Sequence, residues 1–276
     1  MIDRRGFLKT GAAGAVAISA LRGFAEDAPG ASPYGPFKMG MQTYSVRNWK
    51  SFDDVLAKAK ELGINHLEFW NQHLPATADA AKIAEYKAKL ADAKISPTAW
   101  GVVDFKGDVK ANRTLFEFAS AMGIYNISAA FKADAMLSLD RLCEEFPGVH
   151  VGIHNHGPSY YPKAEEVLEL VKDHHKNIGA TADLGHYIRS KQDPLEVIEK
   201  LKDRLYGVHF KDFKLEGGEK ETIPGDGMLK VKETLAALKK CNFQGCLSLE
   251  YESNPKDPIP DMKKALERIQ AAVKEI

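Results

Sequence analysis

The chain has 276 residues, of which 44% are hydrophobic and 28% are charged, and its 38 basic and 38 acidic side chains cancel at pH 7. This composition is typical of a globular protein that buries a full core. It excludes a strongly basic surface of the kind that binds nucleic acid, and no run of Lys and Arg residues alters that conclusion.

The first 25 residues are typical of an export signal. Arg4 and Arg5 form a twin-arginine pair, an apolar run extends from Gly11 to Leu21, and the small residue Ala25 follows. This order of basic, apolar and small residues is that of a secretory leader. The apolar run has about 11 residues, well short of the roughly 20 that cross a bilayer, which argues against a membrane anchor. We therefore expect export by the twin-arginine route to the periplasm or another extracytoplasmic space, with no membrane attachment after cleavage.

Beyond this leader, residues 26–37 are rich in Pro and Gly and are predicted to form a linker. Strand and helix patterns then alternate without a break. The predicted strands are 38–44, 66–69, 96–102, 126–129, 149–154, 179–183, 205–210 and 246–251. The predicted helices are 52–62, 77–93, 110–122, 133–146, 163–172, 194–202, 230–240 and 260–274. Eight such units without a composition shift predict an α/β fold with a single (β/α)8 TIM barrel over residues 38–276, and a doubly wound open sheet is the alternative.

Four of the predicted strands end in a residue that can bind a metal ion. These residues are His154, Asp183, His209 and Glu250, each preceded by apolar or small residues. Because a barrel brings the carboxyl ends of its strands to one rim, we expect the four side chains to converge on one divalent ion. Two imidazoles and two carboxylates suit Mn²⁺, Zn²⁺, Co²⁺ or Fe²⁺ better than Ca²⁺, and Mg²⁺ is also allowed. A satisfied core residue is the alternative for any one of them, but four coincident positions favour a metal site.

Several segments at these strand ends resemble one family. They are LEFW at 67–70, GIHNH at 152–156, DLGH at 183–186, HFKD at 209–212 and LE at 249–250. They resemble the xylose isomerase-like barrels grouped as sugar phosphate isomerases/epimerases, over about residues 38–274. The resemblance implies one divalent ion held by a Glu, an Asp, a His and a second Glu, which correspond here to positions 154, 183, 209 and 250. This chain departs from the common pattern because it has His154 where many members have Glu.

The departure at position 154 bears on the expected reaction. Family epimerases use two metal-bound carboxylates as paired acid and base, and His154 supplies no carboxylate. Glu250 is then the expected base, with His156, Glu68 or Lys211 as its partner, or the reaction needs a single base. The resemblance implies a metal-dependent isomerase or epimerase that acts on a keto-sugar through an enolate or enediolate, and a keto-sugar lyase or dehydratase is the close alternative.

Other residues at the same rim complete the expected site. The candidate catalytic residues are Glu250, His156 and Glu68. The candidate substrate-binding residues are His186, which matches a substrate-contacting His of the family, Lys211, Trp100 and Tyr44. Core packing is the alternative for both aromatic residues, and an ion pair or helix cap is the alternative for Glu68. The turn Gly225-Asp226-Gly227 lacks the Lys and Ser/Thr spacing of a phosphate cradle, so a phosphorylated substrate is not inferred.

Two protein classes other than a sugar-modifying enzyme are alternatives. A non-catalytic periplasmic sugar-binding protein accounts for the missing carboxylate at position 154. A DNA-repair endonuclease of the apurinic type shares this barrel. Cleavage after Ala25 removes four basic residues and one acidic one, which leaves a net charge of −3 and disfavours the endonuclease. We expect a small carbohydrate as the partner and no nucleic acid.

Overall fold

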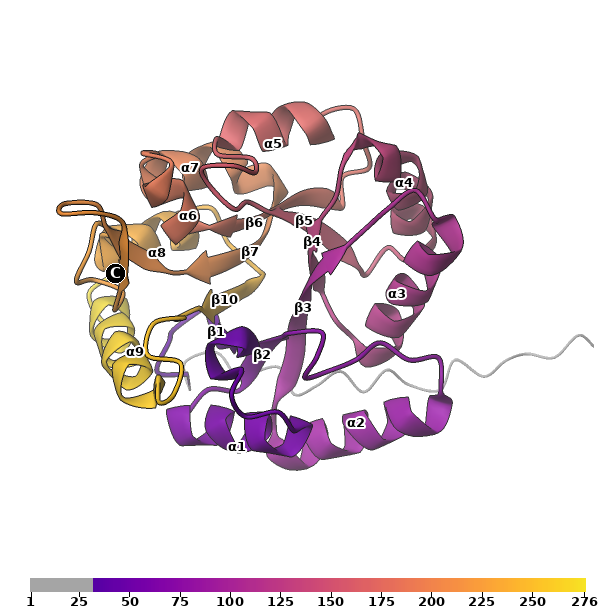
Figure 1. Ribbon diagram of the computed structural model, residues 1–276, viewed down its shortest axis with the longest axis horizontal. Helices are drawn as coiled ribbons and strands as arrows, with labels where there is room; N and C mark the ends of the chain where they lie inside the picture. Colours follow the sequence, from indigo (N-terminus) through magenta and orange to yellow (C-terminus); the bar gives the residue numbers. More distant parts are fainter. Residues whose placement is uncertain (1–31) are drawn as a thin grey trace, which may run out of the picture.

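The computed structural model describes residues 32–276, so the predicted leader and the first half of the predicted linker lie outside the described residues. Within them, eight parallel strands close into a barrel in the order β1-β10-β7-β6-β5-β4-β3-β2. Helices surround this barrel on its outside (Figure 1). The predicted single TIM barrel is confirmed, and the open-sheet alternative is excluded.

The barrel strands lie close to their predicted positions. They are β1 (Lys38–Gln42), β2 (His66–Phe69), β3 (Ser96–Asp104), β4 (Asn126–Ala130), β5 (His150–His154), β6 (Ile178–Asp183), β7 (Leu205–Phe210) and β10 (Cys246–Leu249). The helices are α1 (Phe52–Leu62), α2 (Ala80–Ala93), α3 (Val109–Met122), α4 (Met136–Glu145), α5 (Ala164–Val171), α6 (Leu184–Arg189), α7 (Pro194–Leu201), α8 (Val231–Lys240) and α9 (Ile259–Val273). No helix among residues 32–276 is long and apolar enough to cross a membrane.

Local capping explains where several of these helices begin and end. The Ser51 hydroxyl accepts a hydrogen bond from the Asp54 N–H at 3.0 Å and starts α1. Asp193 caps α7 directly before Pro194, which occupies the first turn. Gly63 and Gly123 end α1 and α3 with φ values of 67° and 74°, a left-handed conformation that glycine adopts without strain.

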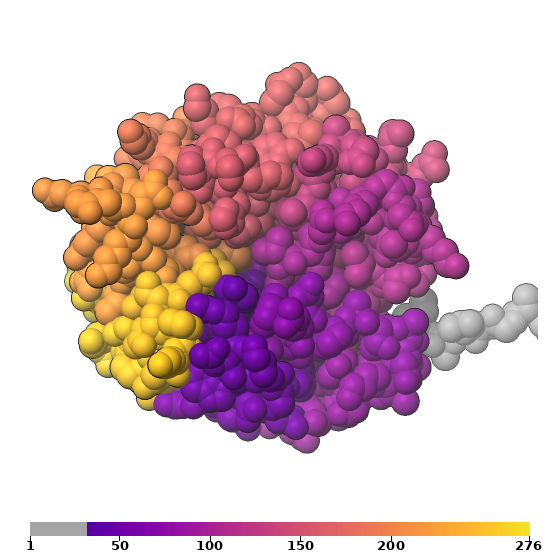
Figure 2. Space-filling model, viewed as in Figure 1, coloured from indigo at the N-terminus to yellow at the C-terminus, as the bar shows by residue number. Residues whose placement is uncertain are grey.

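Two elements were not predicted, and both lie at the carboxyl rim. The short helix α6 starts directly after β6, with Asp183 as its N-cap. Strands β8 (Asp212–Lys214) and β9 (Lys220–Thr222) form an antiparallel hairpin directly after β7. Figure 2, drawn in the same view as Figure 1, shows segments from the start, middle and end of the described chain meeting around a central hollow.

Polar side chains fill the barrel interior next to this rim. Asn126 Nδ2 donates to Thr181 Oγ1 at 2.9 Å, and Ser128 Oγ donates to the same oxygen at 3.2 Å. A Cβ added to Gly207 would lie 2.8 Å from Asn126 Nδ2, so only glycine leaves space for this network. This closely packed, hydrogen-bonded network therefore supports the side chains at the strand ends rigidly from below.

The end of the predicted linker packs against the barrel. Tyr34 and Phe37 are buried at 3% and 5% exposure and belong to the hydrophobic core. The packed part of the chain therefore begins a few residues before β1.

Candidate metal centre and active site

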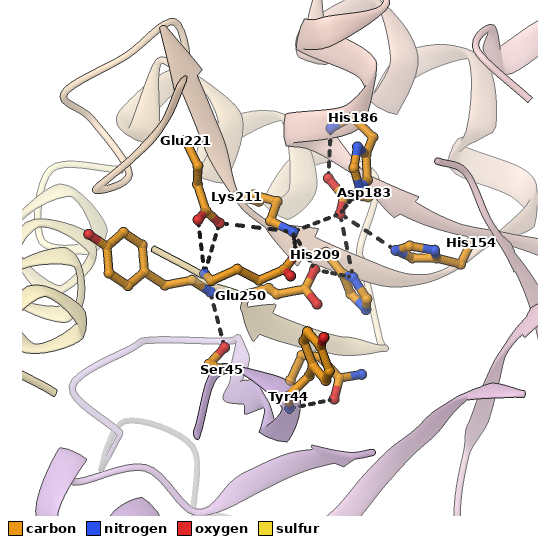
Figure 3. A network of polar contacts seen from close by, with 12 residues as sticks. Tyr44, Ser45, His154, Asp183, His186, His209, Lys211, Glu221 and Glu250 are labelled. Atoms are coloured by element: carbon orange, nitrogen blue, oxygen red, sulfur yellow. Dashed lines mark hydrogen bonds and ion pairs between the residues drawn. The ribbon is translucent and has the colours of Figure 1, made fainter. Parts of the chain in front are cut away.

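Four side chains converge at the carboxyl rim: His154 from β5, Asp183 from β6, His209 from β7 and Glu250, which follows β10 (Figure 3). Each offers one ligand atom, and these atoms lie within 4.8 Å of one another. His154 Nε2 is 3.5 Å from Asp183 Oδ2, and His209 Nδ1 is 3.7 Å from that oxygen and 2.9 Å from Glu250 Oε2. The structure thus brings together the four residues that the sequence predicts as metal ligands.

Three atoms of this cluster are buried without a hydrogen bond of acceptable geometry to any group in residues 32–276. They are His154 Nε2, Asp183 Oδ2 and His209 Nδ1. Buried polar atoms nearly always have a partner, so three neighbouring exceptions indicate that a ligand belongs between them. The mixture of imidazole and carboxylate donors, without sulfur, fits one divalent cation.

Glu68 lies behind His209 and away from the centre of the cluster. His209 Nε2 is 2.9 Å from Glu68 Oε1, Gln42 Nε2 donates to Oε1 at 3.0 Å, and the Ser248 hydroxyl donates to Oε2 at 2.7 Å. Burial acts to raise the pKa of Glu68, but the charge of His209 and the hydrogen bonds from His209 and Ser248 outweigh it and lower that pKa. Glu68 is thus paired with His209, as in the ion-pair alternative, and this position suits a residue that orients His209 better than a catalytic acid or base.

Lys211 is a fixed cation beside the cluster. Its Nζ donates to Glu250 Oε2 at 3.1 Å and to Glu252, and it lies 3.9 Å from both Asp183 and Glu221. Burial acts to lower the pKa of Lys211, but the surrounding carboxylates prevail and raise it. Against the same opposing effect of burial, Lys211 and His209 hold the pKa of Glu250 well below its usual range. Lys211 and Glu250 therefore remain an ammonium and a carboxylate at neutral pH.

Two further histidines lie at the edge of the cluster. His186 of α6 is 4% exposed, its Nδ1 is 3.1 Å from Arg189 Nη1, and its Nε2 is 3.7 Å from Asp183 Oδ2. Burial lowers the pKa of His186 to about 4, so its imidazole is neutral, and the Arg189 contact leaves the proton on Nε2. The exposed His156 packs against it, with ring centroids 4.0 Å apart. Both predicted residues thus face the candidate site.

The two predicted aromatic contacts have different positions. Tyr44 is half-buried and packs edge-to-face on Trp70, with ring centroids 4.9 Å apart, on the β1 side of the cluster (Figure 3). Trp100 is 1% exposed, and its Nε1 donates to the Leu74 carbonyl at 2.9 Å. Trp100 therefore belongs to the core, which corrects its prediction as a substrate contact.

Two acidic residues of the β8–β9 hairpin shape this rim and were not predicted. Glu221 accepts hydrogen bonds from the backbone N–H groups of Glu252 at 3.0 Å and Ser253 at 2.6 Å, which fixes the segment after β10. Asp212 accepts from the N–H groups of a following turn, at 2.8–2.9 Å: Gly225, Gly227, Met228 and Leu229. The adjacent glycines at 217 and 218 are a hairpin signal that was available in the sequence.

The parallel barrel and the His/Asp/Glu cluster at its carboxyl rim define a TIM-barrel protein with a candidate metal centre. The chain belongs to the family of the xylose isomerase-like TIM barrel, which matches residues 56–272. This result confirms the family resemblance that the strand-end segments carry.

The comparisons also give individual relatives. An inosose dehydratase from Bacillus anthracis is 28% identical over 142 residues, which are 45% of this chain and 47% of the relative. The chain thus spans less than half of the length of this curated relative. A protein of Parabacteroides distasonis without assigned function is 27% identical, with a TM-score of 0.69, covering 86% of this chain and 99% of the other. A xylose isomerase-like barrel from Mycobacterium smegmatis in complex with magnesium shares the fold, with 15% identity, a TM-score of 0.66 and coverage of 81% and 88%.

Proposed function

We propose that this chain is a divalent-metal-dependent enzyme that removes the proton next to the carbonyl of a keto-carbohydrate and eliminates a hydroxyl or alkoxyl group from the β carbon. The observation that carries this proposal is the cluster itself. It holds the Glu250 carboxylate 3.1 Å from the Lys211 ammonium, and an imidazole instead of a carboxylate at position 154. The inosose dehydratases among the relatives support elimination as the reaction.

The residues of the cluster have distinct roles in this proposal. His154, Asp183, His209 and Glu250 hold the ion, which when bound supplies Lewis-acid polarisation of a carbonyl oxygen. Glu250 accepts the α-proton, because its carboxylate lies at the cluster beside the Lys211 ammonium, where a substrate polarised by the ion would bind. The C–H electrons form the new double bond, the bond from the β carbon to oxygen breaks, and the proton leaves with that oxygen as water or an alcohol.

Lys211 and His186 have supporting roles. The Lys211 ammonium stabilises negative charge that develops near Glu250. His186 presents its Nε2–H toward the site, because Arg189 occupies its other nitrogen, and it orients a substrate hydroxyl. This elimination requires one base. It is therefore compatible with His154 at the position where many family members have a carboxylate.

An isomerase or epimerase acting through the same enolate is the second candidate function. The observation that favours it is Glu252, which is half-buried and bonded to Lys211 and so supplies a second carboxylate near the cluster. A second proton transfer by Glu252 or Lys211 would then replace loss of the β substituent.

The test uses the Mn²⁺-loaded protein with 2-keto-myo-inositol in deuterated water. We expect an unsaturated product and release of water, detected by ultraviolet absorbance and NMR. Deuterium incorporation with the β substituent retained would instead indicate the isomerase or epimerase. Absence of exchange and of product across keto-carbohydrates would contradict the proposal and favour a binding protein.

The matched variant for this test is Asp183→Asn. It keeps the shape of the side chain but removes a charged ligand, so we expect metal content to fall and turnover to drop by about 100-fold or more. Retention of both metal and turnover by this variant would overturn the site assignment.

A further inference from the structure

We propose that the substrate of this site carries no charge, so that it is a keto-carbohydrate without a phosphate or carboxylate group. This inference rests on the proposed function and adds the substrate class to it. Recognition of an anionic sugar requires a cation or a set of N–H donors that are free to bind it. The buried Lys211, the two half-buried arginines and the glycine-containing turn at the carboxyl rim are all engaged with other groups of the chain.

The buried ammonium of the rim is already surrounded by acids. Lys211 is 2% exposed and lies between four carboxylates: Asp183 and Glu221 at 3.9 Å, Glu250 at 3.1 Å and Glu252 in direct contact. Glu221 also accepts the N–H groups of residues 252 and 253. The single positive charge of Lys211 is therefore already compensated by the carboxylates of this chain, and the ammonium is not free to bind an incoming anion.

The half-buried arginines near the cluster are also occupied. Arg189 Nε donates to Glu219 at 2.7 Å, and its Nη1 is in contact with His186. Arg47 donates to the carbonyl oxygens of Tyr44 at 3.2 Å and Glu252 at 2.9 Å. Its guanidinium also lies 4.7 Å from the centre of the Tyr44 ring. Binding an anion through either arginine would break contacts that hold the rim together.

The glycine-containing turn of residues 225–229 gives independent support. Successive backbone N–H groups in such a turn form a concave binding site for phosphate or carboxylate anions in many proteins. Here the Asp212 carboxylate fills that position, with four N–H donors at 2.8–2.9 Å. Asp212 is fully buried and belongs to the chain itself, so the turn has no N–H group left for a substrate phosphate.

Glu252 has a particular place in this arrangement. Its side chain is 37% exposed, while the Lys211 side chain beneath it is 2% exposed. A ligand that approaches from solvent therefore meets the carboxylate before the ammonium. Replacement of Glu252 by Gln removes this negative charge with little change of shape and releases part of the positive charge of Lys211.

The experiment compares two ligands on two proteins. Binding of 2-keto-myo-inositol and of its phosphate monoester to the Mn²⁺-loaded protein is measured by calorimetry, for the wild type and for Glu252→Gln. We expect the wild type to bind the uncharged ligand about tenfold or more tightly than the ester, because like charges oppose association. We expect Glu252→Gln to strengthen binding of the ester but not of the uncharged ligand. This result would show that the charge of the phosphate, and not its size, weakens binding to the wild type.

The matched control is Glu196→Gln, the same charge change on the outer surface of α7, where the Glu196 side chain is 71% exposed. It should leave the ratio of the two affinities unchanged. Equal or tighter binding of the ester by the wild type overturns the inference and leaves the proposed function standing, as does an unchanged ratio in Glu252→Gln. Failure of both ligands to bind counts against the proposed function, and the inference falls with it.

Discussion

Strand β5 has a histidine at each end, and the two have different surroundings. His150, at the amino rim of the barrel, lies between the rings of Tyr125 and Tyr206, with centroid distances of 4.3 Å and 4.5 Å. His154, at the carboxyl rim, has a buried Nε2 without a hydrogen bond among the described residues, 3.5 Å from Asp183. One imidazole is packed by aromatic rings, and the other faces a carboxylate and the other candidate metal ligands.

The comparison shows that position along the strand determines the role of a histidine more than residue type does. A cleft of about 610 Å³ lies at the amino rim, lined by residues that include Cys143, His150 and Tyr206, and none of the four candidate ligands lines it. Burial lowers the pKa of His150 and raises that of Cys143 to about 12, so the Cys143 thiol stays protonated. The converging set of candidate ligands therefore lies at the carboxyl rim, which carries the active site in TIM-barrel enzymes.

The largest expected effect distinguishes the two histidines at the ends of β5. We expect His154→Gln to weaken metal binding by about 100-fold or more, because a ligand is lost, and His150→Gln to leave it unchanged. Metal affinity is measured by competition with a chromophoric chelator, with circular dichroism as a check of folding. Equal losses in both variants would contradict the division of roles between the rims.

A smaller effect is expected from Glu68, which supports the cluster from behind. In Glu68→Gln the shape is kept, but the acceptor that orients the His209 ring is weakened, so we expect metal affinity to fall about 10–100-fold. The absorption spectrum of the Co²⁺-loaded protein should shift, which a loss of stability alone would not produce. The matched variant Ser248→Ala, which removes a hydrogen bond to the other Glu68 oxygen, should have a milder effect. An unchanged affinity and spectrum in Glu68→Gln would show that Glu68 does not position His209.

The barrel and the ligand set were open to prediction because both depend on local patterns and one topological rule. Strands 66–69 and 205–210 have the predicted bounds, and each of the other six barrel strands differs from its prediction by one or two residues at one end only. Once eight parallel strands are predicted, their last inward residues must share a rim, which places His154, Asp183, His209 and Glu250 together without any knowledge of distances.

The roles of Glu68 and Trp100 were not predictable in the same way. Glu68 and His209 are 141 residues apart, and only the closed barrel shows that one lies behind the other. The sequence places Trp100 near the end of a strand and thus near the rim. In the structure, however, its Nε1 donates a hydrogen bond to the Leu74 carbonyl in the core. The β8–β9 hairpin has three-residue strands, too short for an alternating pattern to reveal, and so Glu221 was missed.

The smallest expected effect concerns a third histidine environment, that of His73 in the segment between β2 and α2. His73 is 2% exposed, and its Nδ1 lies 2.9 Å from Thr43 Oγ1. Burial lowers its pKa from 6.5 to about 4. The unfolded chain therefore binds a proton more readily than the folded one between these values, and His73 makes the protein less stable as pH falls through this window.

In the metal-free protein we expect this effect of His73 to reach about 2 kcal/mol at pH 5 and to vanish above about pH 7. Urea unfolding of the wild type and of His73→Gln at pH 7.5, 6 and 5 gives the free energy of unfolding at each pH. The effect of His73 is the difference between the two proteins in the slope of this free energy against pH. The slope should be shallower in His73→Gln but not zero, because His150 and His186 also have lowered pKa values. Parallel slopes for the two proteins would mean that His73 is already hydrated or paired when it becomes protonated. Its burial would then differ from that of His150, which the aromatic rings of the opposite rim enclose.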